Sequence, residues 1–142
     1  MTLRTGLRIP IALVRTLYAV FLIGTGVMTM VGGVKGIGPT GGDPAMTFLQ
    51  ATIDTGYLFE WVGLFKVIAG GLLLIPRTQA VAVAMILPYS VNILLWVTFV
   101  ARQWLLLGLA DFGASLFLTW AYFDRYRPLL GGLAGGTRRR ID

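Results

Sequence analysis

The fold class follows from residues 78–101, TQAVAVAMILPYSVNILLWVTFVA, which contain no charged side chain. A helix needs about 20 mostly apolar residues to cross the hydrocarbon core of a bilayer. The apolar residues here are continuous, whereas a strand of a membrane β-barrel would alternate apolar and polar residues over roughly 10 positions. The stretch therefore predicts a membrane-spanning helix.

Three other apolar stretches have similar lengths, and the four expected spans cover residues 12–31, 57–75, 78–101 and 103–123. The composition agrees, since 56% of the 142 residues are hydrophobic and only 13% are charged. The mean hydropathy of +0.79 is too high for a soluble domain of this size. We expect a single domain over residues 1–142, with an all-α fold: an integral membrane four-helix bundle with a short outer surface helix.

The surface helix is predicted after a glycine-rich connection over residues 32–42, GGVKGIGPTGG. Asp43 and Pro44 supply an N-cap and a first-turn proline. Apolar residues then recur at helical spacing, at Met46, Leu49, Ile53 and Tyr57. The helix would lie along the membrane surface or form a partly re-entrant lid over the bundle, and both arrangements remain open.

The distribution of basic residues predicts the orientation. One side of the predicted membrane carries only Lys35 and Arg102. The other side carries both termini, the tail over residues 128–142 and nine arginines: Arg4, Arg8, Arg15, Arg77, Arg125, Arg127, Arg138, Arg139 and Arg140. The basic side is cytoplasmic by the positive-inside rule. The net charge of +6 is thus explained by topology, and we expect the lipid bilayer as a partner and no nucleic acid.

The chain contains neither cysteine nor histidine. Structural zinc, iron–sulfur clusters, histidine-ligated haem, thiol redox chemistry and imidazole catalysis are therefore excluded for this chain alone. We expect no metal site, no catalytic residue and no cofactor within the chain, and we favour a protein that is not an enzyme.

Three polar residues are predicted to share one depth in the membrane: Lys66, Asn92 and Asp111. At about 1.5 Å per residue, each lies roughly 12 to 14 Å from the outer end of its span, near the middle of a core about 30 Å thick. A charge at the centre of a span costs about 2.5 to 3.5 kcal/mol on insertion scales, so pairing two opposite charges would offset much of the cost. We predict a Lys66–Asp111 ion pair with a hydrogen bond from Asn92.

Several other residues are expected to support this polar pocket. Thr25 or Thr29 of the first span could complete the network. Small residues mark the faces that pack inward, namely Gly63, Gly70 and Gly108. Pro88 is expected to kink the third span and to free one backbone carbonyl. The sequence does not decide whether the pocket fixes helix neighbours or holds a small polar molecule, a proton or a quinone head group.

Residues 48–100 resemble the DoxX-like family of small bacterial four-helix membrane proteins. The resemblance rests on TGYLF at 55–59, IAGGLLL at 68–74 followed by Pro76 and Arg77, LP at 87–88 and VNI at 91–93. The family pattern usually has a glutamate where this chain has Lys66, and often a histidine near Val97. Only Pro88 and Asn92 match residue by residue, so the role of the family's glutamate and histidine does not carry over.

The resemblance implies a helper of membrane redox complexes in the bacterial inner membrane, because the family is associated with thiosulfate:quinone oxidoreductases and terminal oxidases. Our leading expectation is a non-catalytic accessory or scaffold subunit of such a complex, with a quinone in or near it. Its partners would be redox-complex subunits or further copies of this chain. The alternative is a small transporter or permeation element using Lys66, Asn92 and Asp111, and a third possibility is a quinone-handling subunit whose electron carrier lies in a partner chain.

Overall fold

The computed structural model describes residues 6–31 and 43–126, and within these ranges every regular element is a helix. The elements are α2 (Arg8–Val31), α3 (Pro44–Asp54), α4 (Leu58–Leu74), α5 (Gln79–Phe99), the 3-10 helix η1 (Arg102–Trp104) and α6 (Leu105–Ala121). The all-α prediction is confirmed. The predictions for the connection at 32–42 and the basic tail at 128–142 fall outside the described residues.

The predicted helix limits agree with the structure to within a few residues. The surface helix begins where the capping pattern placed it, since the Asp43 carboxylate accepts from the Ala45 backbone N–H at 2.9 Å and Pro44 follows the cap. The α4–α5 connection is the tight turn expected from the sequence, and the Thr78 hydroxyl closes it by donating to the Leu72 carbonyl at 2.7 Å. A short 3-10 turn, η1, stands at the predicted start of the last span.

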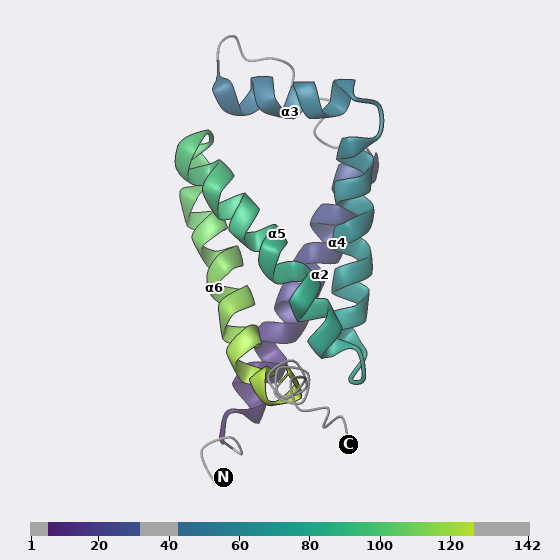
Figure 1. The fold of residues 1–142 in the computed structure, drawn as a ribbon, viewed down its shortest axis with the longest axis vertical. Helices are drawn as coiled ribbons and strands as arrows, with labels where there is room; N and C mark the ends of the chain where they lie inside the picture. Colours follow the sequence, from purple (N-terminus) through teal and green to yellow (C-terminus); the bar gives the residue numbers. More distant parts are fainter. Residues whose placement is uncertain (1–5, 32–42, 127–142) are drawn as a thin grey trace, which may run out of the picture.

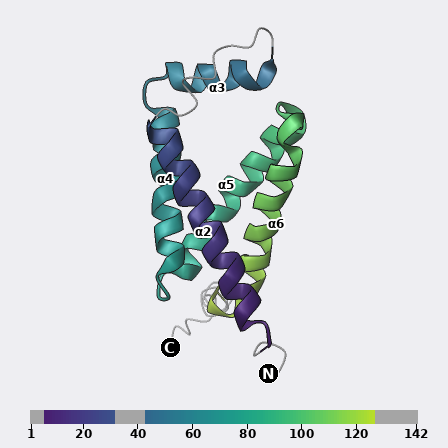
Figure 2. The same ribbon diagram turned by 180° about the vertical axis from the view of Figure 1, so that it is seen from behind.

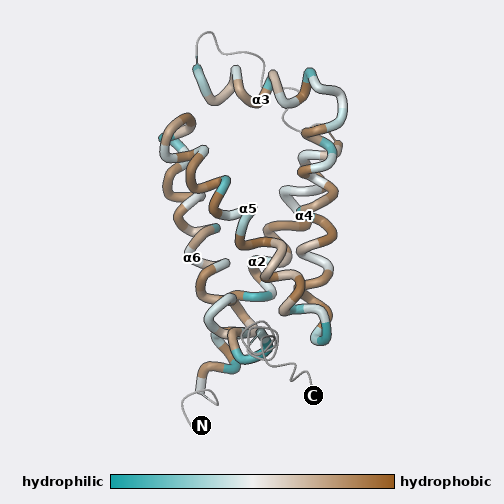
Figure 3. Tube along the Cα trace, in the orientation of Figure 1, coloured by the Kyte–Doolittle hydropathy of each residue, from teal (hydrophilic) through white to brown (hydrophobic). Residues whose placement is uncertain are grey.

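Three segments in the described residues are long and apolar enough to cross a membrane: α2, α5 and the segment from Arg102 to Ala121. Helix α4 has 17 residues, which gives a length of about 25 Å. Counting α3 with α4 gives a fourth candidate, but the two meet at an angle of 93°. Brown, hydrophobic segments run along all four long helices (Figure 3). These apolar helices suggest a membrane protein.

The four long helices form two pairs, α2 with α4 and α5 with α6 (Figures 1 and 2). The pairs cross near the end of the molecule where α2 begins and α6 ends, and they diverge toward the opposite end. Helix α3 lies across that diverging end. We call the crossing end the base and the diverging end the mouth.

Glycines allow the closest approach of two helices, which is between α2 and α4. A Cβ at Gly26 would lie 2.7 Å from the Gly63 carbonyl oxygen, and a Cβ at Gly70 would lie 2.9 Å from the carbonyl oxygen of Ala19. Gly108 packs in the same way on the Val97 side chain, between α6 and α5. The inward-facing roles predicted for Gly63, Gly70 and Gly108 therefore agree with the structure.

The hydrophobic core lies where the two helix pairs cross. Its buried residues come from all four long helices: Tyr18, Ala19, Leu22, Ala69, Leu73, Ala82, Val83, Ile86 and Leu118. Below it, the Arg125 guanidinium donates to the Pro76 carbonyl at 2.8 Å and the Tyr126 hydroxyl donates to the Ala80 carbonyl. The base of the bundle is therefore fastened by both apolar packing and hydrogen bonds.

Candidate functional site

The three polar residues expected in one pocket lie in three different environments. Asp111 on α6 is 7% exposed. Lys66 on α4 is half-buried, and Asn92 on α5 is exposed. No hydrogen bond or ion pair joins Lys66, Asn92 and Asp111 to one another in the described part of the chain.

Asp111 instead joins a hydrogen-bonded network with α2 and α5. Its Oδ1 accepts from the Tyr18 hydroxyl at 2.9 Å, and that hydroxyl lies 3.0 Å from the Ser90 Oγ. Because a phenol has one proton and Tyr18 donates it to Asp111, the Ser90 hydroxyl must be the donor to Tyr18. Both hydroxyl residues are buried, with Tyr18 at 5% exposure and Ser90 at 0%.

The second carboxylate oxygen of Asp111 has a different environment. Oδ2 is buried and accepts no hydrogen bond within the described part of the chain. Other hydroxyls on α6 donate to their own helix, since Ser115 donates to the Phe112 carbonyl at 2.9 Å and Thr119 to the Ser115 carbonyl at 2.7 Å. A buried oxygen without a donor is energetically costly, so this atom marks Asp111 as a candidate functional group.

The predicted ion pair between Lys66 and Asp111 is not formed in the structure, which describes both residues. The Lys66 ammonium lies over the ring of Tyr89, 6.0 Å from the ring centroid, at the limit for a cation–π contact. The physical reason is the choice of neighbours, because α4 packs mainly on α2 while α6 packs mainly on α5. The two residues therefore sit on different helix pairs.

The threonines expected to complete the network bond within their own helix. Thr25 Oγ1 donates to the Phe21 carbonyl at 2.8 Å, and Thr29 Oγ1 donates to the Thr25 carbonyl at 2.8 Å. Such bonds to the preceding turn are common for threonine inside a helix. Neither residue reaches Asp111 through the hydrogen bond that it donates.

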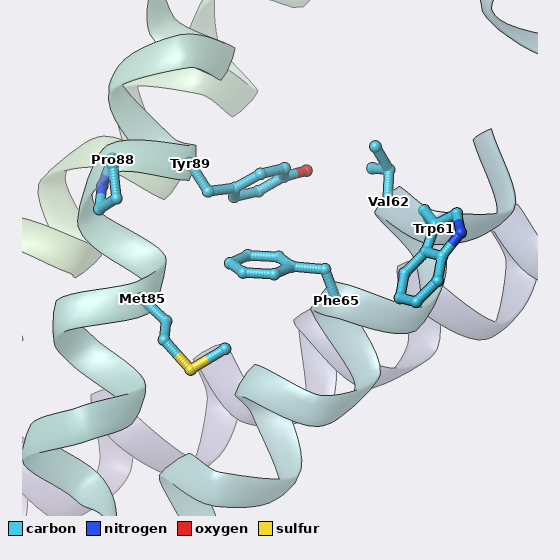
Figure 4. Close-up of a pocket in the computed structure, with 6 residues that line it drawn as sticks. All are labelled: Trp61, Val62, Phe65, Met85, Pro88 and Tyr89. Carbon is cyan, nitrogen blue, oxygen red and sulfur yellow. The ribbon is translucent and has the colours of Figure 1, made fainter. Parts of the chain in front are cut away.

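A second candidate site is a groove between α4 and α5, with a volume of about 380 Å³. Trp61, Val62 and Phe65 line it from α4, and Met85, Pro88 and Tyr89 line it from α5 (Figure 4). The Phe65 and Tyr89 rings reach toward each other across it, with centroids 5.6 Å apart. The Tyr89 hydroxyl points along the groove toward α4. Pro88 therefore lines the groove. Helix α5 runs unbroken from Gln79 to Phe99, with Pro88 inside it.

The groove has almost entirely apolar walls, and Tyr89 contributes a hydroxyl among its lining side chains. The Lys66 ammonium, which is not among the lining residues, lies 6.0 Å from the centroid of the Tyr89 ring. Such a site suits a flat, largely apolar ligand that carries hydrogen-bond acceptors. Within residues 6–31 and 43–126, by contrast, no group of three or more Cys, His, Asp or Glu side chains could hold a metal ion.

The roles of Tyr18, Ser90 and the groove were not predicted from the sequence. Residues two apart on a helix face different directions, so Ser90 and Asn92 could not both point toward Asp111. Nothing in the sequence indicated which of them would do so. The groove did leave a signal, since Trp61 and Phe65 on one helix and Met85 and Tyr89 on the next are both spaced i, i+4.

Comparison with known proteins adds no assignment to these sites. No family model, curated protein or solved structure matches the chain.

Proposed function

We propose that the chain is an integral membrane protein of the bacterial inner membrane, in which α2, α4, α5 and α6 each cross the bilayer. The length and hydropathy of the helices support this arrangement, with α4 as the shortest span. The excess of arginine on one side supports cytoplasmic termini and an outer position for α3. Membership of the DoxX-like family belongs to the same proposal and rests on the sequence motifs alone.

Within the membrane, the protein acts as a non-catalytic accessory subunit of a redox complex and holds a quinone head group in the α4–α5 groove. The observation that carries this proposal is the groove itself, in which the tilted Phe65 and Tyr89 rings lie 5.6 Å apart and the Lys66 ammonium lies 6.0 Å from the centroid of the Tyr89 ring. A quinone ring is flat and apolar, and its carbonyl oxygens are acceptors that Tyr89 and Lys66 can serve. Electron carriers would be supplied by partner chains, because this chain lacks cysteine and histidine ligands.

Isolation of the tagged protein from its own membranes in a gentle detergent tests the accessory role. Native mass spectrometry and an absorption spectrum of the intact assembly should reveal stoichiometric partners that carry redox cofactors. A colourless assembly containing only copies of this chain would overturn the accessory role.

Quinone binding is tested by quenching of tryptophan fluorescence, because Trp61 lines the groove. Lys66→Met and Tyr89→Phe each remove a hydrogen-bond donor, and each is expected to weaken binding of a short-chain quinone about tenfold, which corresponds to about 1.4 kcal/mol. Tyr57→Phe serves as the control, since Tyr57 is 60% exposed and lies outside the groove. Equal affinities in all four proteins would exclude this site.

A transport function is a second candidate, and the buried Oδ2 atom of Asp111 favours it. Ionisable groups inside a membrane bundle commonly mark ion or substrate pathways. Proteoliposomes offer the test: flux of a small cation that Asp111→Asn abolishes, with unchanged protein insertion, would support transport. Absence of any flux above that of empty liposomes would count against it.

A further inference from the structure

Helix α3 contacts both sides of the mouth through two unlike connections. It is joined to α4 by the chain itself, at residues 55–57, and it reaches the α5–η1 region through side chains. Figures 1 and 2 both show α3 extending from the top of α4 across to the side of α5 and α6. A helix held in this way resembles a strap across the mouth.

The junction with α4 has the features of a hinge. The two helices meet at 93°, and Gly56 between them has φ +78°, the one positive φ in the described residues. Short-range hydrogen bonds brace the turn, from the Gly56 N–H to the Ile53 carbonyl at 2.9 Å and from the Leu58 N–H to the Thr55 Oγ1 at 3.1 Å. Hinges are commonly a few such residues between elements, where backbone dihedral angles can change.

The connection to α5 and η1 consists of two kinds of contact. The Phe48 ring lies 6.0 Å from the Trp96 ring, which in turn lies 5.3 Å from the Trp104 ring. Beside them, the Gln103 side-chain amide donates to Asp43 Oδ2 at 3.3 Å, while the other oxygen of Asp43 caps α3. We call these five residues the latch.

The contacts that form the latch are weak. Phe48 remains 51% exposed, and the Gln103–Asp43 bond is long and exposed. The Trp96 indole N–H is buried and has no hydrogen-bond partner within residues 6–31 and 43–126, so the latch gains no hydrogen bond from this residue. The base, in contrast, is held by the hydrophobic core and by the Arg125–Pro76 bond. Release of α3 from the latch therefore requires far less free energy than separation of the two helix pairs.

We propose that α3 is a hinged strap that closes the outer mouth of the bundle, turning about Gly56 and held shut by the latch on α5 and η1. Trp61, which lines the groove, lies one turn after the start of α4, near the junction with the strap. The inference goes beyond the proposed function and does not depend on which ligand the groove binds.

Spin labels test the strap in the full-length protein in nanodiscs, because the chain has no native cysteine. Ala51→Cys on α3 and Leu106→Cys on α6 are both exposed, and their separation reports the strap. Combining Phe48→Ala with Gln103→Ala should broaden this distance distribution and shift it to longer values. The pair Ile68→Cys and Leu106→Cys, which reports the bundle itself, should stay unchanged.

Two control variants and a cross-link complete the test. Met28→Ala removes an exposed apolar side chain far from the latch, and Gly71→Ala, where a Cβ has open space, is matched to Gly56→Ala at the hinge. The latch and hinge variants should alter the strap distance and the controls should not. In the Phe48→Ala background, a disulfide between Asp43→Cys and Gln103→Cys, formed before spin labelling, should keep the distribution narrow. The proposal is overturned if the latch variants leave the strap distance unchanged, or if both spin-label pairs broaden equally.

Discussion

At the scale of single residues, the hydroxyl of Tyr18 is expected to contribute to the stability of the fold. It donates to Asp111 and accepts from Ser90, all within the buried interior. Tyr18→Phe leaves the Asp111 carboxylate without a described donor and the Ser90 hydroxyl without its acceptor. The expected loss is about 1 to 3 kcal/mol of unfolding free energy, the cost of orphaned buried polar groups. Denaturant titration in mixed micelles measures it.

A double-mutant cycle of Tyr18→Phe with Asp111→Asn shows whether the two residues act together. Contacting residues in one network typically give a coupling energy of about 0.5 to 3 kcal/mol. Tyr57→Phe provides the control because Tyr57 is exposed, and it should change the unfolding free energy by no more than about 0.5 kcal/mol. Strictly additive effects of Tyr18→Phe and Asp111→Asn would contradict the network.

The sequence predicts a common depth for the three polar residues, but it could not predict their partners. Counting residues along a span placed Lys66, Asn92 and Asp111 at one level. Partnership depends also on the direction in which each side chain points and on which helices are adjacent. Asp111 accepts a hydrogen bond from Tyr18, whose hydroxyl lies at the end of a long side chain on α2. The partners expected on that helix were threonines.

At the scale of helices, the α2–α4 contact depends on glycines at defined positions. A Cβ at Gly26 would lie 2.7 Å from the Gly63 carbonyl oxygen and 2.9 Å from the Lys66 Cβ, so Gly26→Ala must push the helices apart. Overpacking of this kind typically costs about 1 to 3 kcal/mol. Thermal unfolding in detergent should show a clearly lowered midpoint.

Gly24→Ala is the matched control for this helix contact, since a Cβ at Gly24 meets nothing within 4 Å. It should leave the midpoint unchanged or raise it slightly, because alanine favours a helix over glycine by up to about 1 kcal/mol. Equal losses in Gly24→Ala and Gly26→Ala would mean that helix propensity, and not close packing, decides the effect.

The elements themselves were largely predictable because each has a local cause. The cap at Asp43 and Pro44 starts α3, and the Pro76-containing turn separates α4 from α5. Glycine spacing alone does not define a contact face: Gly26 and Gly70 lie at the α2–α4 contact, whereas a Cβ at Gly24 or Gly71 would meet open space. Glycines one or two residues apart point to different sides of a helix, and the sequence does not indicate which side contacts another helix.

At the scale of the whole molecule, the two-pair arrangement separates a fastened base from a mouth spanned by α3 (Figure 1). The pairing of α2 with α4 and of α5 with α6 could not be read from the sequence, because it depends on complementary surfaces of segments far apart in the chain. The distribution of charge, however, predicts the orientation of the molecule in the membrane without any knowledge of how the helices pack. All described arginines except Arg102 lie toward the base, on the side predicted to be cytoplasmic.

This orientation predicts which introduced cysteines are accessible from outside the cell. In spheroplasts, Ala51→Cys on α3 should react with a membrane-impermeant maleimide, whereas Arg77→Cys in the α4–α5 turn should react only after permeabilisation. Arg77→Cys still leaves eight arginines on the cytoplasmic side, so the positive-inside bias persists. Both residues are exposed in the structure, which means that failure to react reports the membrane and not burial. The opposite labelling pattern would invert the topology and place α3 in the cytoplasm, and labelling of both positions in intact spheroplasts would contradict an odd number of membrane crossings between α3 and the turn.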